Sequence, residues 1–139
     1  MKRRILVIDD EDSIRFAFKE ILDYGGYEVD TAGGYNEALS LIFEKEFDLI
    51  FTDLNLNDRT GIDILKQVRK KRLDCPVVII TGSPSSDTAA EAFRLGVFNY
   101  ISKPIEAEKI LQIADMALKE RLGNLRVCSG NRPCFRTDK

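Results

Sequence analysis

Five polar side chains lie at or just beyond the ends of short apolar runs, and together they could transfer a phosphoryl group. They are Asp9, Asp10, Asp53, Thr81 and Lys103. Carboxylate oxygens are the protein ligands that Mg2+ prefers. A carboxylate beside a divalent cation and an ammonium group can attack a phosphoryl group, because the cations neutralise the charge on the transferring oxygens. The set predicts an aspartyl-phosphate site in which Thr81 hydrogen-bonds a phosphoryl oxygen.

The apolar runs that precede these residues alternate with segments of helical periodicity. We predict strands over 5–8, 27–31, 48–52, 77–80 and 99–101, with 27–31 nearer an edge because its residues alternate more. Positions at three- and four-residue spacing mark five helices: Ile14, Phe18, Ile21, Leu22; Ala38, Leu41, Ile42; Ile64, Leu65, Val68; Ala89, Ala92, Phe93; and Ile110, Ala114, Ala117. Five such units are too few for an eight-stranded barrel. We therefore expect an α/β fold, a doubly wound parallel sheet of five strands in the order 2-1-3-4-5 with helices on both faces.

This strand order predicts which of the polar side chains meet. The strand at 48–52 lies beside the strand at 5–8, so Asp53 should lie close to Asp9 and Asp10 at the switch point where such sheets bind ligands. Like charges at close range make each carboxyl harder to ionise unless a cation intervenes. Helix capping, a turn aspartate or a solvated lysine would explain any one of these residues alone. The complete set favours a shared site.

Composition excludes several other functions. The chain has 139 residues and a net charge of -2, which fits one domain. An isoelectric point near 5.3 argues against direct nucleic-acid binding, and no apolar run reaches the ~18 residues of a membrane span, so we expect a cytoplasmic protein. With no histidine and an odd number of cysteines, zinc, haem and Ser-His-Asp chemistry are excluded or nearly so. Residues 123–139 lack periodicity and are predicted to be a flexible tail on a domain at 1–122.

In their order along the chain, these motifs resemble the receiver domain of bacterial two-component response regulators. The resemblance covers roughly residues 3–121. It implies a flavodoxin-like fold. Its motifs are the segments 5–11, 53–56, 78–82 and 95–104, with Gly61 eight residues beyond Asp53. Each motif is weak alone, but the ordered set is highly specific.

The resemblance implies a role for each residue of the reacting centre. Asp53 would accept the phosphoryl group from a sensor histidine kinase. Asp10 would bind Mg2+ directly and Asp9 largely through water, while Asp53 and the backbone carbonyl of Asn55 would complete the protein ligands. Lys103 would bind a phosphoryl oxygen.

The resemblance also implies a conformational switch. Thr81 and Tyr100 would be the switch pair, Asn55 and Ser83 would tune the lifetime of the phosphoryl group, and the bond between Lys103 and Pro104 is often cis in this family. The fourth helix, fifth strand and fifth helix would form the switched surface. That surface would control a downstream output domain or protein, or would form a homodimer.

Some features depart from the family or leave its output open. Asn57 stands where the family often has proline and Asn99 where it often has an acid, which bears on loop stiffness. The segment 87–90 resembles receivers of enhancer-binding transcriptional regulators. Leu111, Leu118 and Leu125 recur at seven residues, but a simple helix face explains them better than a coiled coil.

Three other functions are weaker alternatives. A magnesium-dependent phosphatase or phosphotransferase would need a general acid two residues beyond its nucleophile, where this chain has Asn55. A binding module that works without phosphorylation would have no need of the repulsive acids. Flavin binding would place a phosphate beside the acidic segment 9–12, which would repel it. We therefore expect no turnover of an external substrate.

Overall fold

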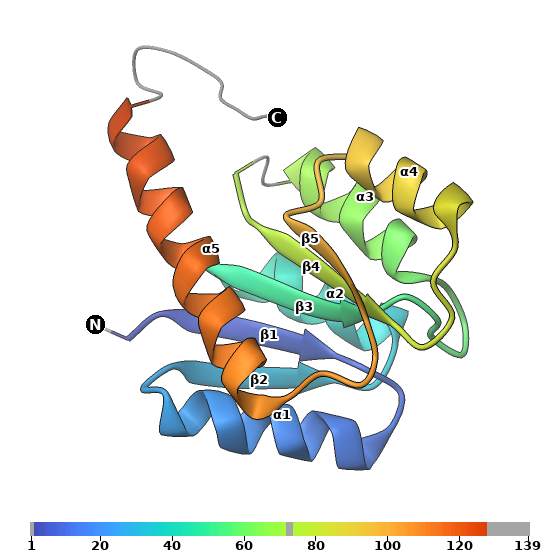
Figure 1. Cartoon of the computed structure of the whole chain (residues 1–139), viewed down its shortest axis with the longest axis horizontal. Coiled ribbons are helices and arrows are strands. Elements are labelled where there is room, and N and C mark those ends of the chain that lie inside the picture. The colour runs from blue at the N-terminus through green and yellow to red at the C-terminus, as the bar shows by residue number, and fades with distance from the viewer. Residues whose placement is uncertain (1, 72–73, 128–139) are drawn as a thin grey trace.

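In the computed structural model, a parallel sheet lies between two layers of helices (Figure 1). The structure describes residues 2–71 and 74–127. The strands are β1 (Arg4–Ile8), β2 (Glu28–Ala32), β3 (Leu49–Asp53), β4 (Val77–Thr81) and β5 (Asn99–Ser102). The helices are α1 (Asp12–Tyr24), α2 (Tyr35–Glu44), α3 (Gly61–Lys71), α4 (Ser86–Arg94) and α5 (Ala107–Val127). The order β2-β1-β3-β4-β5 and the parallel pairing confirm the predicted fold.

The central strands are covered on both faces. All five residues of β3 and of β4 are buried, as near-continuous apolar runs predict for a parallel sheet. Helices α1 and α5 pack with one face of the sheet around Phe51, whereas α2, α3 and α4 pack with the other around Ile50. Strand β2 lies at one edge, as its alternating sequence predicts.

The predicted helix positions face the core with one exception. Phe93 was expected on the inner face of α4, but its side chain is 59% exposed. Helix α4 lies at the margin of its layer and buries only Ala92. A helix at the margin of a layer buries only a narrow apolar stripe. The periodic pattern therefore predicted a wider buried face on α4 than the structure has.

Helix α5 passes the predicted domain boundary. It runs to Val127, so the boundary expected at Leu122 falls inside the helix, and residues 128–139 lie outside the described part of the chain. Glycine within a helix costs about 1 kcal/mol relative to alanine, which one residue such as Gly123 adds without ending a long helix. Leu111 and Leu118 pack on the sheet, whereas the side chain of Leu125 is not described. None of the described helices is long and apolar enough to cross a bilayer.

Candidate functional site

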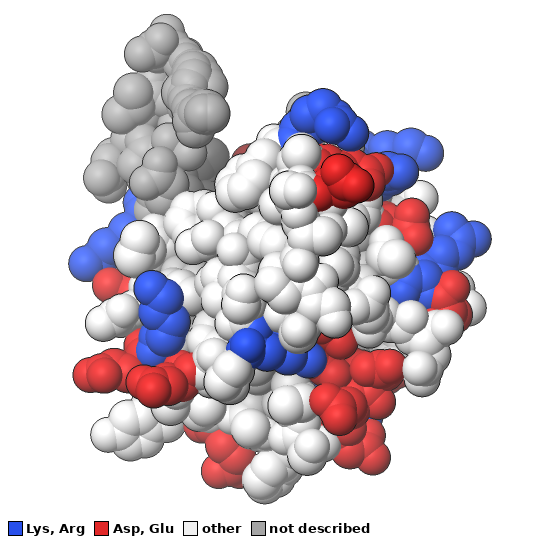
Figure 2. Space-filling model, turned by 45° about the vertical axis from the view of Figure 1, so that its right-hand side comes forward, with Lys and Arg blue, Asp and Glu red and all other residues white. Residues whose placement is uncertain are grey.

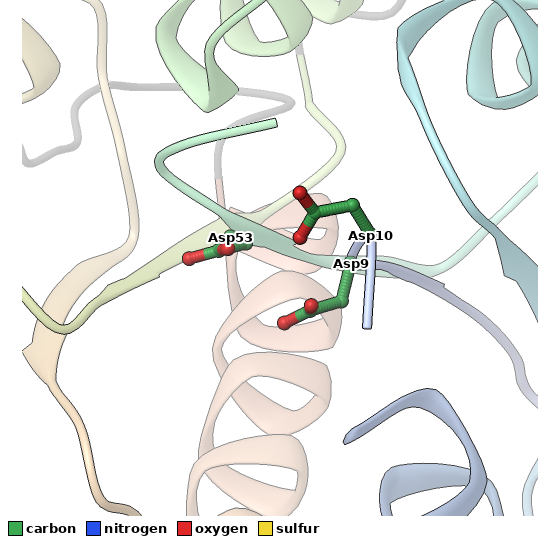
Figure 3. Close-up of side chains that lie close together, drawn as sticks. All are labelled: Asp9, Asp10 and Asp53. Carbon is green, nitrogen blue, oxygen red and sulfur yellow. The ribbon is translucent and has the colours of Figure 1, made fainter. Parts of the chain in front are cut away.

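Three carboxylates converge where β1 and β3 end. The register pairs Ile8 with Thr52, so Asp9 and Asp53 follow side by side. One carboxylate oxygen from each of Asp9, Asp10 and Asp53 lies within 4.8 Å of the other two (Figure 3). Two oxygens bound to one Mg2+ lie at most about 4.2 Å apart, because each Mg–O distance is about 2.1 Å. The acids therefore fit a shared Mg2+ after small side-chain movements.

Lys103, which directly follows β5, contacts two of the same acids. Its Nζ is 3.4 Å from Asp9 Oδ2 and 3.5 Å from Asp53 Oδ1. Its backbone N–H donates to the Thr81 carbonyl oxygen at 2.8 Å, which continues the pairing of β4 with β5. The peptide bond to Pro104 is cis, as the resemblance predicted. The structure thus brings Asp9, Asp10, Asp53 and Lys103 together from three strand ends.

Burial and like charge act on the central carboxyl. Asp53 is only 8% exposed, and this burial, together with the charge of Asp9, raises the pKa of Asp53 although Lys103 opposes the shift. Burial would lower the pKa of Lys103, but the attraction of Asp9 and Asp53 outweighs it and the pKa is raised. Lys103 is therefore charged at neutral pH, and an added cation would make ionised Asp53 more stable.

The raised pKa of Asp53 predicts two pH effects. Because protons compete with Mg2+ for this carboxyl, Mg2+ binding measured by calorimetry should weaken on acidification at a higher pH than it would for an aspartate with an ordinary pKa. Without Mg2+, the folded chain binds more protons than the unfolded chain between the two pKa values of Asp53. Its contribution to the free energy of unfolding therefore falls as pH rises through that window. Asp53→Asn should lack this fall, and an identical pH profile in the variant would refute the assignment.

The first carboxylate is held by its own loop. Asp9 is 3% exposed, and its Oδ1 accepts from the Glu11 N–H at 2.9 Å. Arg15 donates from Nη1 to the Asp9 backbone oxygen and from Nη2 to Asp12. Sequence reasoning missed Arg15: its three-residue spacing from Asp12 suggests a helix ion pair, but its contact with Asp9 depends on the path of the loop.

Gly61 lets the start of α3 approach the end of β3, which carries Asp53. Its N–H donates to the Leu54 carbonyl oxygen at 2.7 Å. A Cβ atom at Gly61 would lie 2.6 Å from the Asp53 backbone oxygen, closer than side chains approach backbone atoms in folded proteins. The glycine is therefore required by packing around Asp53.

Gly61→Ala should lower stability and disturb the site. Relief of the contact would move Asp53 or the start of α3, and overpacking of this kind costs about 1–3 kcal/mol. Urea unfolding and Mg2+ calorimetry measure the two effects. Gly82→Ala is the matched control, because a Cβ atom at Gly82 meets nothing within 4 Å. Equal stability of the two variants would contradict the packing argument.

The two predicted switch residues both contact the segment that leads into α4. Thr81 is fully buried, and its Oγ1 accepts from the Ser83 N–H at 2.9 Å. The Tyr100 hydroxyl lies 2.6 Å from Thr88 Oγ1 and accepts from the Ser85 N–H at 3.3 Å. Sequence reasoning did not identify Ser85 or Thr88. The only available signal was the cap at Ser85, whose side chain accepts from the Thr88 N–H.

Asn55 lies in the loop between β3 and α3. It is exposed and forms an isolated antiparallel bridge with Thr60. Its position two residues beyond Asp53 suits a backbone ligand at this end of the sheet, which stays a prediction.

The chain is similar in sequence to known signalling proteins. The family model of the response regulator receiver domain matches residues 5–115. The chain is 32% identical over 133 residues to the transcriptional regulatory protein DltR of Streptococcus agalactiae, covering 89% of this chain and 59% of that protein. It is 36% identical over 118 residues to the alginate biosynthesis transcriptional regulatory protein AlgB of Pseudomonas aeruginosa, covering 85% of this chain and 26% of that protein. The chain thus spans only part of the transcriptional regulators it matches.

The fold agrees with a solved receiver structure. A CheY-like response regulator receiver domain protein from Methanospirillum hungatei superimposes with a TM-score of 0.87 at 30% identity, covering 89% of this chain and 99% of that one. The matched family residues 5–115 include all strand residues but Arg4, together with the acids at the strand ends. The chain therefore belongs to the response regulator receiver domain family.

Proposed function

We propose that this chain accepts a phosphoryl group on Asp53 from a sensor histidine kinase. The observation that carries the proposal is the position of Lys103, whose ammonium lies between the carboxylates of Asp9 and Asp53 and within 3.5 Å of each. Burial and the charge of Asp9 raise the pKa of Asp53, so added positive charge would stabilise its anion. A divalent cation would supply that charge, and it would also neutralise the negative oxygens of an incoming phosphoryl group.

The residues fit Mg2+ as the cation. Asp10 and Asp53 would bind it directly, Asp9 largely through water, and the Asn55 carbonyl would be a further ligand. Mg2+ would supply charge neutralisation at the phosphoryl oxygens. Asp9, restrained by the Glu11 N–H and by Arg15, keeps its second oxygen directed toward Lys103.

The chain's own groups would carry the transfer itself. A carboxylate oxygen of Asp53 forms a bond to phosphorus, while the phosphorus–nitrogen bond of the donor phosphohistidine breaks and its electron pair returns to the imidazole. Lys103 leaves its ion pair with Asp53 and binds a phosphoryl oxygen. The chain would turn over no external substrate.

The output would be a change around α4. The Thr81 hydroxyl accepts from the Ser83 N–H, so turning it to donate to a phosphoryl oxygen on Asp53 would strain that hydrogen bond and shift the segment that leads to Ser85. Because Ser85 and Thr88 hold the Tyr100 hydroxyl, that shift would release the ring. The phosphoryl group would thus change the populations of two arrangements.

The switched surface would be formed by α4, β5 and α5. Figure 2 shows a broad area of uncharged side chains between acidic and basic groups on the side where α4 lies, and Phe93 on α4 is 59% exposed. We propose that this surface contacts an output domain or protein, or a second copy of the chain, in the cytoplasm. The relatives' names support transcription as the process controlled, with no direct nucleic-acid contact by this domain.

The proposal is tested by incubating the chain with Mg2+ and acetyl phosphate. Mass spectrometry should show one added phosphoryl group, and hydrogen exchange at residues 83–88 should change only when Mg2+ and the phosphoryl donor are both present. An unmodified mass under these conditions would overturn the proposal. A modified mass with unchanged exchange would overturn the switching step alone.

A further inference from the structure

The loop that carries Asn55 is attached to a helix far from it in sequence. Asp58 Oδ1 accepts from the Tyr35 N–H, the first residue of α2, at 3.3 Å. The Arg59 guanidinium carbon lies 4.8 Å from the centroid of the Tyr35 ring, within the range of a cation–π contact. We call the contacts of Asp58 and Arg59 with Tyr35 the loop anchor.

The start of α2 is built to receive this loop. Its N-cap residue is Gly34, which has no side chain with which to cap the helix. A Cβ atom at Gly34 would lie 3.6 Å from Asp58 Oδ1, so the carboxylate occupies the space beside the bare backbone. A carboxylate near a helix N-terminus is favoured by both the unsatisfied N–H groups and the helix dipole. Asp58 thus does for α2 what an N-cap side chain does elsewhere.

The remainder of the loop transmits this attachment toward the site. The Leu56 N–H donates to the Arg59 carbonyl oxygen at 3.0 Å, and Asn55 pairs with Thr60. Leu56 is 8% exposed and packs in the core layer that contains Tyr35. The loop is therefore closed on itself and fixed at its tip by Asp58.

The sequence of this loop makes such an attachment useful. Asn57 lies in this loop and lacks the ring by which a proline would restrict the backbone. A loop without that restriction samples more conformations before it binds a ligand, and ordering it on binding weakens the affinity. The contacts with α2 order the tip of the loop before the ligand binds, so less conformational entropy is lost on binding.

We propose that Asp58, aided by Arg59, is a positioning residue that holds the Asn55 carbonyl ready for Mg2+. The inference rests on the proposed function, since Mg2+ binding is part of it. Asp58 acts through the loop. Its loss should therefore weaken Mg2+ binding by about threefold to tenfold, the range that corresponds to one lost capping hydrogen bond.

Calorimetric titration of the 139-residue chain with Mg2+ tests this proposal through three variants. Asp58→Ala removes the acceptor and the charge, and should show the threefold to tenfold loss. Asp58→Asn keeps an acceptor oxygen, and its affinity should stay within about twofold of the wild type. Equal losses in the two variants would mean that Asp58 acts only by its charge, which would overturn the proposal.

Glu37→Ala is the matched control at the same helix. Glu37 accepts from the Gly33 N–H at 2.8 Å, so its loss disturbs the start of α2 and removes one negative charge without touching the loop. Its Mg2+ affinity should equal that of the wild type. A loss as large as that of Asp58→Ala would show that general damage to α2 is responsible and would overturn the proposal.

Hydrogen exchange in Mg2+-free solution supplies a second readout. The Leu56 amide should exchange faster in Asp58→Ala than in the wild type and in Glu37→Ala, because only the first variant releases the loop. Unchanged exchange at Leu56 would overturn the proposal even if the affinity fell. If the wild type binds no Mg2+, the proposed function itself fails. If the wild type binds Mg2+ and Asp58→Ala binds it equally well, only the role of Asp58 fails.

Discussion

We expect Asp53→Asn to abolish the mass increase that acetyl phosphate and Mg2+ should produce in the wild type. The amide is close in size to the carboxyl, so the site keeps its shape, but the amide oxygen cannot form a stable bond to phosphorus. Intact-protein mass spectrometry measures the modified fraction. A mass increase that persists in the variant would place the phosphoryl group elsewhere and contradict the role of Asp53.

The same variant separates loss of function from loss of fold. Asp53 ionises against burial and the charge of Asp9, so removing its charge should raise the free energy of unfolding in Mg2+-free solution. Asp48→Asn is the matched control, because Asp48 lies immediately before the other end of β3 and accepts from the Arg4 N–H. Asp48→Asn should be phosphorylated like the wild type.

Lys103→Ala has the second largest expected effect. Loss of one positive group that faces the transferring oxygens should slow phosphorylation by about 100-fold to 1,000-fold, as for the loss of one donor at other charged transition states. Mg2+ binding should stay equal or become tighter, because the ammonium of Lys103 repels a cation at the same acids. Stopped reactions analysed by mass give the rate, and calorimetry gives the affinity.

A slower rate without weaker Mg2+ binding would identify the role of Lys103. Damage to the fold would lower both the rate and the affinity. Lys45→Ala is a control for charge alone, since Lys45 pairs with Asp30 on the edge strand β2 at 2.8 Å, and it should change neither quantity. A Lys103→Ala variant that is phosphorylated at the wild-type rate would remove Lys103 from the reacting centre.

The sequence by itself was enough to predict the fold and the place of the site. The apolar runs that became β3 and β4 have the unbroken character of strands buried on both faces, and this property is local. Parallel connection then brings the residue after each run to one edge of the sheet, so Asp9, Asp10 and Asp53 could be predicted to meet. The exposure of Phe93 could not be predicted, because it depends on which neighbours α4 meets. The periodic pattern also did not extend α5 past Leu122, where the helix continues to Val127.

Only the tertiary structure decided how these residues are held. The contact of Tyr100 with Thr88 spans twelve positions and that of Tyr35 with Asp58 spans 23, and no periodic pattern encodes either pair. Such contacts arise where loops from different strands meet, and loop paths follow from the packing of the elements they join. Local hydrophobicity indicates where the strands lie, and the rules of parallel connection then favour one strand order. Side-chain partners across loops, by contrast, exist only after the sheet and helices have formed.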